Sequence, residues 1–246
     1  DIHRHGDMAA FRDNFGQLEL SQGLTTVING NCGMSAAPVD KGNKGLLNYL
    51  RPVIGDILPY VSTDTMAGNF RSLDSIALPL NCGMLVGCGV MWSSVLGGEH
   101  PTEAETKKFR KILERELASG AMGVSLGLGY APECFYTTDE LIRALAPLTG
   151  QSIPITVHMR QEGGGVVTAA QEMVEVARAL KAPVHISHLK AMGRDNWRGK
   201  VPQVLALLDR ARQEGLDLSC DVYPYTAGST QLLHILPPEF LEGGMD

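Results

Sequence analysis

The stretch from residue 153 to residue 188 reads IPITVHMRQEGGGVVTAAQEMVEVARALKAPVHISH and carries the clearest structural signal in the chain. It contains two short apolar segments, residues 153–158 and 184–188, that are rich in β-branched residues. Such segments are typical of buried parallel strands. Residues 166–180 between them place apolar side chains at helical spacing, so the stretch predicts a parallel βαβ unit.

The same alternation extends in both directions along the chain. Further strands are predicted at residues 1–5, 24–30, 84–90, 124–128 and 216–223. With the two above they make about seven strands that alternate with helical segments. This repetition favours a (β/α) barrel over an open sheet.

The clearest helix start is at Thr102, an N-cap residue with Glu105 three positions later as a capping box. This helix is expected to end at Gly120. Residues 34–80 carry scattered Gly, Pro and Asn without clean periodicity, which predicts a helix followed by a loop that faces the substrate. The other helices are predicted at residues 138–148, 166–180 and 201–214.

Composition narrows the class of protein. The 246 residues are 44% hydrophobic and 20% charged, enough for one large domain with a core. The net charge of -6 and the lack of a Lys/Arg cluster argue against nucleic acid or an anionic membrane as a partner and favour a small molecule. No apolar run reaches the roughly 20 residues of a membrane span and no signal-peptide layout is present, so a cytoplasmic location is expected. The five cysteines are odd in number and scattered, which favours reduced thiols.

His3 and His5 stand in the predicted strand at residues 1–5. A spacing of two on a strand points both imidazoles to one side, as a pair of metal ligands requires. An isolated pair of this kind is explained equally well by two polar residues at a strand end. Cys32 follows the predicted strand at residues 24–30, where a cysteine is commonly a small packed side chain, although thiolate is a strong zinc ligand.

His158 and His188 end the two strands of the stretch quoted first. The C-terminal ends of barrel strands form the active-site face, and four histidines and a cysteine at strand ends favour a metal site there. His185 is expected to face the opposite side and to be structural. Imidazole and thiolate prefer zinc to magnesium or calcium. A catalytic zinc ion polarises a carbonyl and lowers the pKa of bound water, so the predicted chemistry is amide hydrolysis.

Beyond these residues, the sequence resembles the amidohydrolase superfamily and, within it, the N-acyl-D-amino-acid deacylases, also called D-aminoacylases. The likeness extends over nearly the whole chain. It rests on a combination of segments: HRH at 3–5, QGLTTV at 22–27, GNCG at 30–33, GAMGVSLGL at 120–128, HMRQE at 158–162, SHLK at 187–190 and DVYPY at 221–225.

The resemblance implies an α/β fold, a distorted (β/α)8 TIM-like barrel with about seven of its eight strands in this chain. It implies that Cys32, His158 and His188 bind one zinc ion tightly, and that His3 and His5 form a second, weaker site. Cys32 takes the place of a carboxylated lysine that many relatives carry on the fourth strand. The segment 124–128 contains no lysine.

The resemblance also implies substrate-binding residues. Lys190 matches a lysine that contacts the substrate carboxylate, and Tyr130 and Tyr223 resemble tyrosines that line the substrate pocket. From the sequence alone, Lys190 is equally well explained as a solvated surface residue. Either tyrosine can simply pack with its hydroxyl satisfied.

Several features depart from the family pattern. The general acid/base aspartate is expected beyond residue 246, so no catalytic residue is assigned within the chain, and neither Asp221 nor Asp246 is given that role. Cys88 and Trp92 stand where relatives tend to carry His and Arg, and are expected to be structural or peripheral to the site. Residues 1–246 are expected to form one barrel domain truncated at both ends, without the small flanking β-domain and the last strand.

The leading hypothesis is zinc-dependent hydrolysis of the amide bond of N-acyl-D-amino acids. One alternative is a cyclic-amide hydrolase or deaminase, because the same metal cage serves those reactions. Cys32 in place of the strand-four lysine counts against it. Another is an inactive fragment that only binds metal. The acyl group, the D or L preference and the oligomeric state are not predicted.

Overall fold

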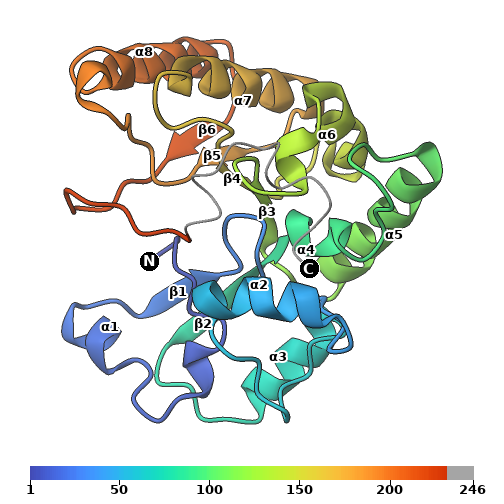
Figure 1. The fold of residues 1–246 in the computed structure, drawn as a ribbon. Helices are drawn as coiled ribbons and strands as arrows, with labels where there is room; N and C mark the ends of the chain where they lie inside the picture. The colour runs from blue at the N-terminus through green and yellow to red at the C-terminus, as the bar shows by residue number, and fades with distance from the viewer. Residues whose placement is uncertain (232–246) are drawn as a thin grey trace.

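The computed structural model describes residues 1–231 and contains one curled, all-parallel sheet (Figure 1). Within those residues the sheet has six strands, hydrogen-bonded in the order in which they occur along the chain. A curled parallel sheet with sequential strand order and helical crossovers is consistent with part of a TIM-like barrel. The strands are β1 (Thr26–Asn29), β2 (Asn81–Gly87), β3 (Gly123–Gly127), β4 (Ile155–His158), β5 (Val184–Ile186) and β6 (Leu218–Cys220).

Helices connect consecutive strands and cover the outer face of the sheet (Figure 1). The predicted βαβ stretch is confirmed, because α7 (Val166–Leu180) has the expected bounds and joins β4 to β5. The other helices are α1 (Gln17–Ser21), α2 (Lys44–Ile54), α3 (Met66–Asp74), α4 (Cys88–Trp92), α5 (Glu103–Ala118), α6 (Thr138–Ala144) and α8 (Lys200–Gln213).

Local sequence explains where two of these helices begin and end. The capping box at Thr102 and Glu105 is confirmed at the start of α5. α6 is shorter than the predicted 138–148. It ends at Ala144, and the chain continues as a 3-10 helix, Ala146–Leu148. Pro147 lies in that 3-10 helix, and a proline disfavours α-helical geometry for the residue before it.

The N-terminal segment corrects one strand prediction. Residues 1–5 are irregular and do not form a strand. Asp1 exchanges hydrogen bonds with Thr26 and Ile28 beside β1, but the pairing goes no further. The amide of His3 donates to the carboxylate of Asp1 at 3.0 Å instead of to the sheet.

Two other segments differ from expectation. Residues 34–80 contain two helices, α2 and α3, where one was predicted. β2 ends at Gly87, earlier than the predicted residue 90, because the backbone amides of Gly87 and Val90 donate hydrogen bonds to the loop after β1 instead of to a neighbouring strand. The amide of Gly87 donates to Ser35 Oγ at 3.0 Å, and that of Val90 donates to the carbonyl of Gly33 at 3.1 Å.

The largest cluster of buried side chains lies between the sheet and helices α3 to α8. Trp92 stacks on Phe109 with ring centroids 4.0 Å apart, and both side chains are buried. Cys88, also buried, belongs to the same cluster. Cys88 and Trp92 are therefore core residues, as expected. Within residues 1–231, no helix combines the length and apolar character that a membrane crossing requires. Asp246 lies outside the described residues.

Candidate metal centre

Histidine, cysteine and carboxylate side chains converge at the C-terminal ends of the strands. Among residues 1–231, two sets of three could each hold a metal ion, with all ligand atoms of a set within 4.8 Å of one another. One set is His3, Cys32 and His188, and the other is His158, Glu162 and His188. His188 belongs to both sets, so the two form one continuous cluster.

The spacing of the donor atoms suits zinc. Cys32 Sγ lies 3.4 Å from His3 Nε2 and 3.5 Å from His188 Nε2. His158 Nδ1 lies 2.9 Å from His188 Nε2. Ligands at ordinary zinc–nitrogen and zinc–sulfur bond lengths, arranged tetrahedrally, are about 3.3–3.6 Å apart. The cluster therefore has both the donor chemistry and nearly the separations of a zinc site.

Two of these residues have unusual backbone geometry. Cys32 has φ 56° and His188 has φ 40°, both in the left-handed region that side chains rarely adopt. Among the described residues, only one other non-glycine residue has positive φ, Lys181 at the C-cap of α7, where left-handed geometry is common. Backbone strain of this kind concentrates at functional sites, where the surrounding structure holds it in place.

Burial controls the ionisation of the cluster. It lowers the pKa of His3 and, to about 4, that of His5, with a further contribution from His188 in each case. Both imidazoles are therefore neutral at pH 7 and have a lone pair for a metal. Burial, followed by the nearby carboxylates of Glu162 and Asp221, raises the pKa of the Cys32 thiol. A divalent cation supplies the positive charge that stabilises a buried thiolate.

Glu162 is a member of the cluster whose role the sequence did not reveal. Its Oε1 lies 2.7 Å from His188 Nδ1 and accepts a hydrogen bond from Lys190 Nζ at 2.5 Å. Burial alone would raise the pKa of Glu162, but the hydrogen bond from His188 and the charges of the neighbouring histidines and lysine lower it to about 2. The sequence feature that could have identified Glu162 as part of the site is its position four residues after His158.

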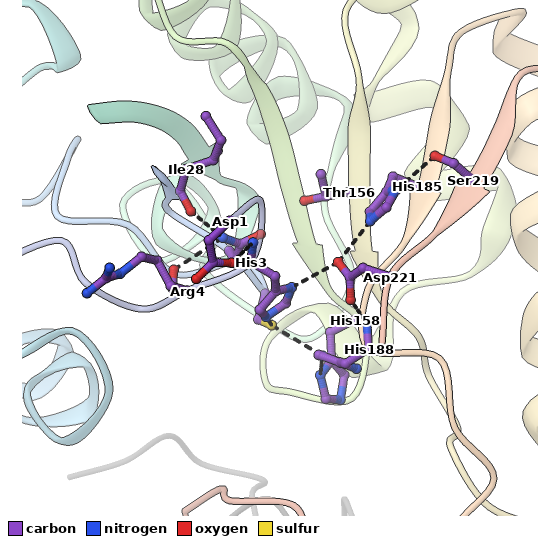
Figure 2. A network of polar contacts seen from close by, with 12 residues as sticks. Asp1, His3, Arg4, Ile28, Thr156, His158, His185, His188, Ser219 and Asp221 are labelled. Atoms are coloured by element: carbon purple, nitrogen blue, oxygen red, sulfur yellow. Dashed lines mark hydrogen bonds and ion pairs between the residues drawn. The ribbon is translucent and has the colours of Figure 1, made fainter. Parts of the chain in front are cut away.

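Asp221 supports the other side of the cluster (Figure 2). Its carboxylate accepts a hydrogen bond from the amide of His188 and lies 2.8 Å from His185 Nε2 and 3.7 Å from His3 Nδ1. His185 also contacts Ser219 Oγ at 2.8 Å. His185 is outside both ligand sets, as expected of a structural residue, but it reaches the cluster through Asp221. The sequence did not predict this link.

The predicted substrate-binding residues lie beside the cluster. Lys190 is only partly exposed and is paired with Glu162, and its Nζ lies 5.5 Å from the ring centre of Tyr223. The hydroxyl of Tyr130 lies 3.1 Å from His158 Nδ1. All three side chains therefore surround one end of the predicted metal site.

His5 is adjacent to the cluster but belongs to neither ligand set. Its ring centre lies 5.5 Å from that of His3. Its Nδ1 is buried, and no hydrogen-bond partner for this atom is found among residues 1–231. A buried imidazole nitrogen without a partner is costly, and a metal ion is one ligand that would satisfy it.

Comparisons with known proteins find similarity to deacylases. A D-aminoacylase from Alcaligenes xylosoxydans xylosoxydans is 34% identical over 94% of this chain and 47% of its own length. This chain also resembles the crystal structure of an N-acyl-D-glutamate deacylase from Bordetella bronchiseptica, which is complexed with zinc and a phosphonate mimic of the tetrahedral intermediate. The two structures superpose with a TM-score of 0.82 at 30% sequence identity. The match covers 92% of this chain and 47% of the deacylase chain.

A third comparison concerns metal number. A D-aminoacylase structure described as having a binuclear metal centre, with one-metal activation and second-metal attenuation, has a TM-score of 0.81 at 31% identity and covers 93% of this chain and 47% of that one. No family model matches the chain. The chain spans about half the length of the relatives that it matches.

Proposed function

Because this chain belongs to the D-aminoacylase family of the amidohydrolases, we propose that it is part of a zinc-dependent (β/α)8 barrel that hydrolyses the amide bond of N-acyl-D-amino acids. One observation carries the proposal. Side chains from the N-terminal segment and from the ends of β1, β4 and β5 bring nitrogen and sulfur donors together at or near the separations that zinc prefers.

The proposed ligand roles are those that the family resemblance implies, and the donor positions support them in part, since Cys32 and His188 share one ligand set and His158 and His188 share the other. Cys32, His158 and His188 bind the tighter zinc ion, and His3 and His5 contribute a second, weaker site next to Cys32. A bound zinc ion would polarise the amide carbonyl and lower the pKa of a water molecule. Glu162 orients His188, since a carboxylate that binds one imidazole nitrogen leaves the other free for the metal. Asp221 holds the backbone of His188 by accepting a hydrogen bond from its amide.

Lys190 binds the carboxylate of the substrate. Its ammonium group already pairs with Glu162 at 2.5 Å, so a substrate carboxylate would share this cation. Tyr130 and Tyr223 line the same side of the site. The residue that takes the proton from water and returns it to the leaving amine is expected beyond residue 246.

Metal analysis tests the proposal first. We expect about one zinc ion per chain in the wild type and its loss in Cys32→Ala and His188→Ala, by elemental analysis. Matched controls are Cys82→Ala and His100→Ala, which lie outside both ligand sets and should retain zinc. A folded wild-type protein without zinc would overturn the metal assignment.

Turnover tests the reaction. The full-length gene product that carries this chain should release free amino acid from N-acetyl-D-amino acids faster than from the L enantiomers. Zinc binding without such turnover would support the inactive, metal-binding alternative. The cyclic-amide hydrolase and deaminase alternative is not favoured, because the similar relatives are deacylases.

A further inference from the structure

Glu133 is a buried carboxylic acid without a role in the proposed reaction. It lies in the 3-10 helix Glu133–Phe135 between β3 and α6, and only 1% of its surface is exposed. Side chains of this kind are rarely buried unless they have a specific partner. The partners of Glu133 are backbone groups near the C-terminal ends of three neighbouring strands.

Three glycines form a cradle around the carboxyl group. The amide of Gly127, at the end of β3, donates to Glu133 Oε2 at 2.9 Å. A Cβ atom placed on Gly33 would lie 2.3 Å from the same oxygen, and one on Gly89 would lie 3.0 Å from it. The backbone can approach the carboxyl group this closely because these three positions have no side chain.

This cradle adjoins the backbone of Cys32. Gly33 follows Cys32 directly, and both residues are left-handed, with φ 75° and 56°. A Cβ atom on Gly127 would lie 2.3 Å from the carbonyl oxygen of Cys32. The chain at Cys32 and Gly33 is therefore enclosed by the strand ends that Glu133 contacts.

Other contacts hold Gly33 on its remaining sides. Its amide donates to Ser125 Oγ at 3.0 Å, and its carbonyl accepts from the amide of Val90 at 3.1 Å. A left-handed non-glycine residue such as Cys32 costs roughly 1–2 kcal/mol and persists only where the surroundings impose it. The close approach of Glu133 to Gly33 is one of those constraints.

Glu133 also lines a small cavity. Glu133 Oε1 is buried, and no hydrogen-bond partner for it is found among residues 1–231. The cavity has a volume of about 10 Å³, and its lining includes Cys32, Ser93, Tyr49 and Tyr130 as well as Glu133. This is close to the space that one buried water molecule needs, about 10–15 Å³.

We propose that Glu133 is a positioning residue that fixes Cys32 for metal binding, acting through the backbone of Gly33 and Gly127 and not as a ligand. The inference rests on the proposed zinc site. Burial raises the pKa of Glu133 to about 8, so the group is a neutral acid at pH 7. A neutral carboxamide has the same shape and can accept the same hydrogen bond from Gly127.

Three substitutions distinguish a role of Glu133 in positioning Cys32 from a role in filling space in the core. Glu133→Gln keeps shape and acceptor, Glu133→Met keeps volume without an acceptor, and Glu133→Ala removes both. Glu175→Ala, an exposed position on α7, is the control. The readouts are zinc affinity by competition with a chelator and, after replacement of zinc by cobalt, the thiolate-to-cobalt charge-transfer absorption, which reports the bond to Cys32.

We expect Glu133→Met and Glu133→Ala to weaken zinc binding about 10-fold or more and to reduce the charge-transfer band. Glu133→Gln and Glu175→Ala should stay within about 3-fold of the wild type. If Glu133→Ala does not fold, the zinc affinity of Glu133→Met alone tests the inference. If the folded Glu133→Met or Glu133→Ala protein binds zinc as tightly as the wild type, this inference is overturned and the proposed function is not. The same holds if Glu133→Gln binds zinc as weakly as Glu133→Met. A wild type without zinc would overturn the proposed function, and the inference with it.

Discussion

The Oε1 atom of Glu162 lies 2.7 Å from Nδ1 of His188, on the side of the imidazole away from Cys32. A carboxylate at this distance favours the proton on Nδ1, which leaves the lone pair of Nε2 directed at the other ligands. Glu162 therefore favours Nε2 of His188 as the nitrogen available to a metal ion, and it does so against Lys190 Nζ, a donor that lies 3.1 Å from the same Nδ1. The same oxygen pairs with Lys190, so one carboxylate joins the metal site to the substrate site.

Glu162→Gln should weaken zinc binding about 10-fold or more, because an amide is a poorer acceptor for His188 and no longer favours one tautomer. The measurement is zinc affinity by chelator competition. Glu175→Gln makes the same chemical change at an exposed position and should leave affinity unchanged. Equal affinities in the two variants would mean that Glu162 does not support His188.

Asp221→Asn should destabilise the metal-free protein by about 1–3 kcal/mol, since it disrupts a partly buried network that joins His185, His3 and the amide of His188. Urea unfolding in the presence of a chelator measures this free energy. The matched control is Asp217→Asn, at an exposed position four residues earlier. A change below about 0.5 kcal/mol would contradict a structural role for the network.

Stability should fall with rising pH because of Glu133. Burial raises its pKa from 4.5 to about 8, so between these values the unfolded chain loses a proton that the folded protein keeps. The contribution is fully present at acid pH and is lost as pH rises, by up to about 1.4 kcal/mol per pH unit, until the folded group ionises near pH 8.

Glu133→Gln isolates this contribution, because the amide does not titrate. The difference in unfolding free energy between wild type and variant, measured without metal from about pH 5 to pH 9, should shift in favour of the variant and level off above about pH 8. Parallel stability curves would show that the folded and unfolded pKa values are equal.

Phe109→Ala should cost about 3–5 kcal/mol of stability, because it removes the ring that stacks on Trp92 in the core. The zinc content of the fraction that remains folded should not change, since the pair is outside both ligand sets. Leu205→Ala, at a position that is 42% exposed, serves as the control and should cost less than about 1 kcal/mol. Loss of zinc from folded Phe109→Ala protein would connect this part of the core to the metal site.

The sequence predicted those elements whose signals are local. α7 was predicted at its observed bounds because its apolar residues keep helical spacing, and the start of α5 was predicted because Thr102 and Glu105 form a capping box. Residues 1–5 were wrongly predicted as a strand, since strand formation depends on continued pairing with β1. That pairing stops when Asp1 binds the amide of His3.

For the candidate site, too, residues with a local sequence signal were predicted and residues that depend on distant neighbours were not. Cys32, His158 and His188 were predicted as ligands because each stands at or beside the predicted end of an apolar segment, and His3 was predicted from its spacing of two from His5. Glu133, Glu162 and Asp221 were given no supporting role, because their importance comes from neighbours that are distant in sequence. The amide of His188, for example, lies 33 residues from the Asp221 carboxylate that it binds.

Cys32 and His188 are separated by 156 residues along the chain, and His3 and Cys32 by 29. Contacts over such long separations form late in folding, because closing a long loop costs entropy before the contact is made. The donor atoms therefore come together only after the intervening strands have docked. A metal ion bound there would join the first and fifth strands as a cross-link, slowing unfolding more than it speeds folding.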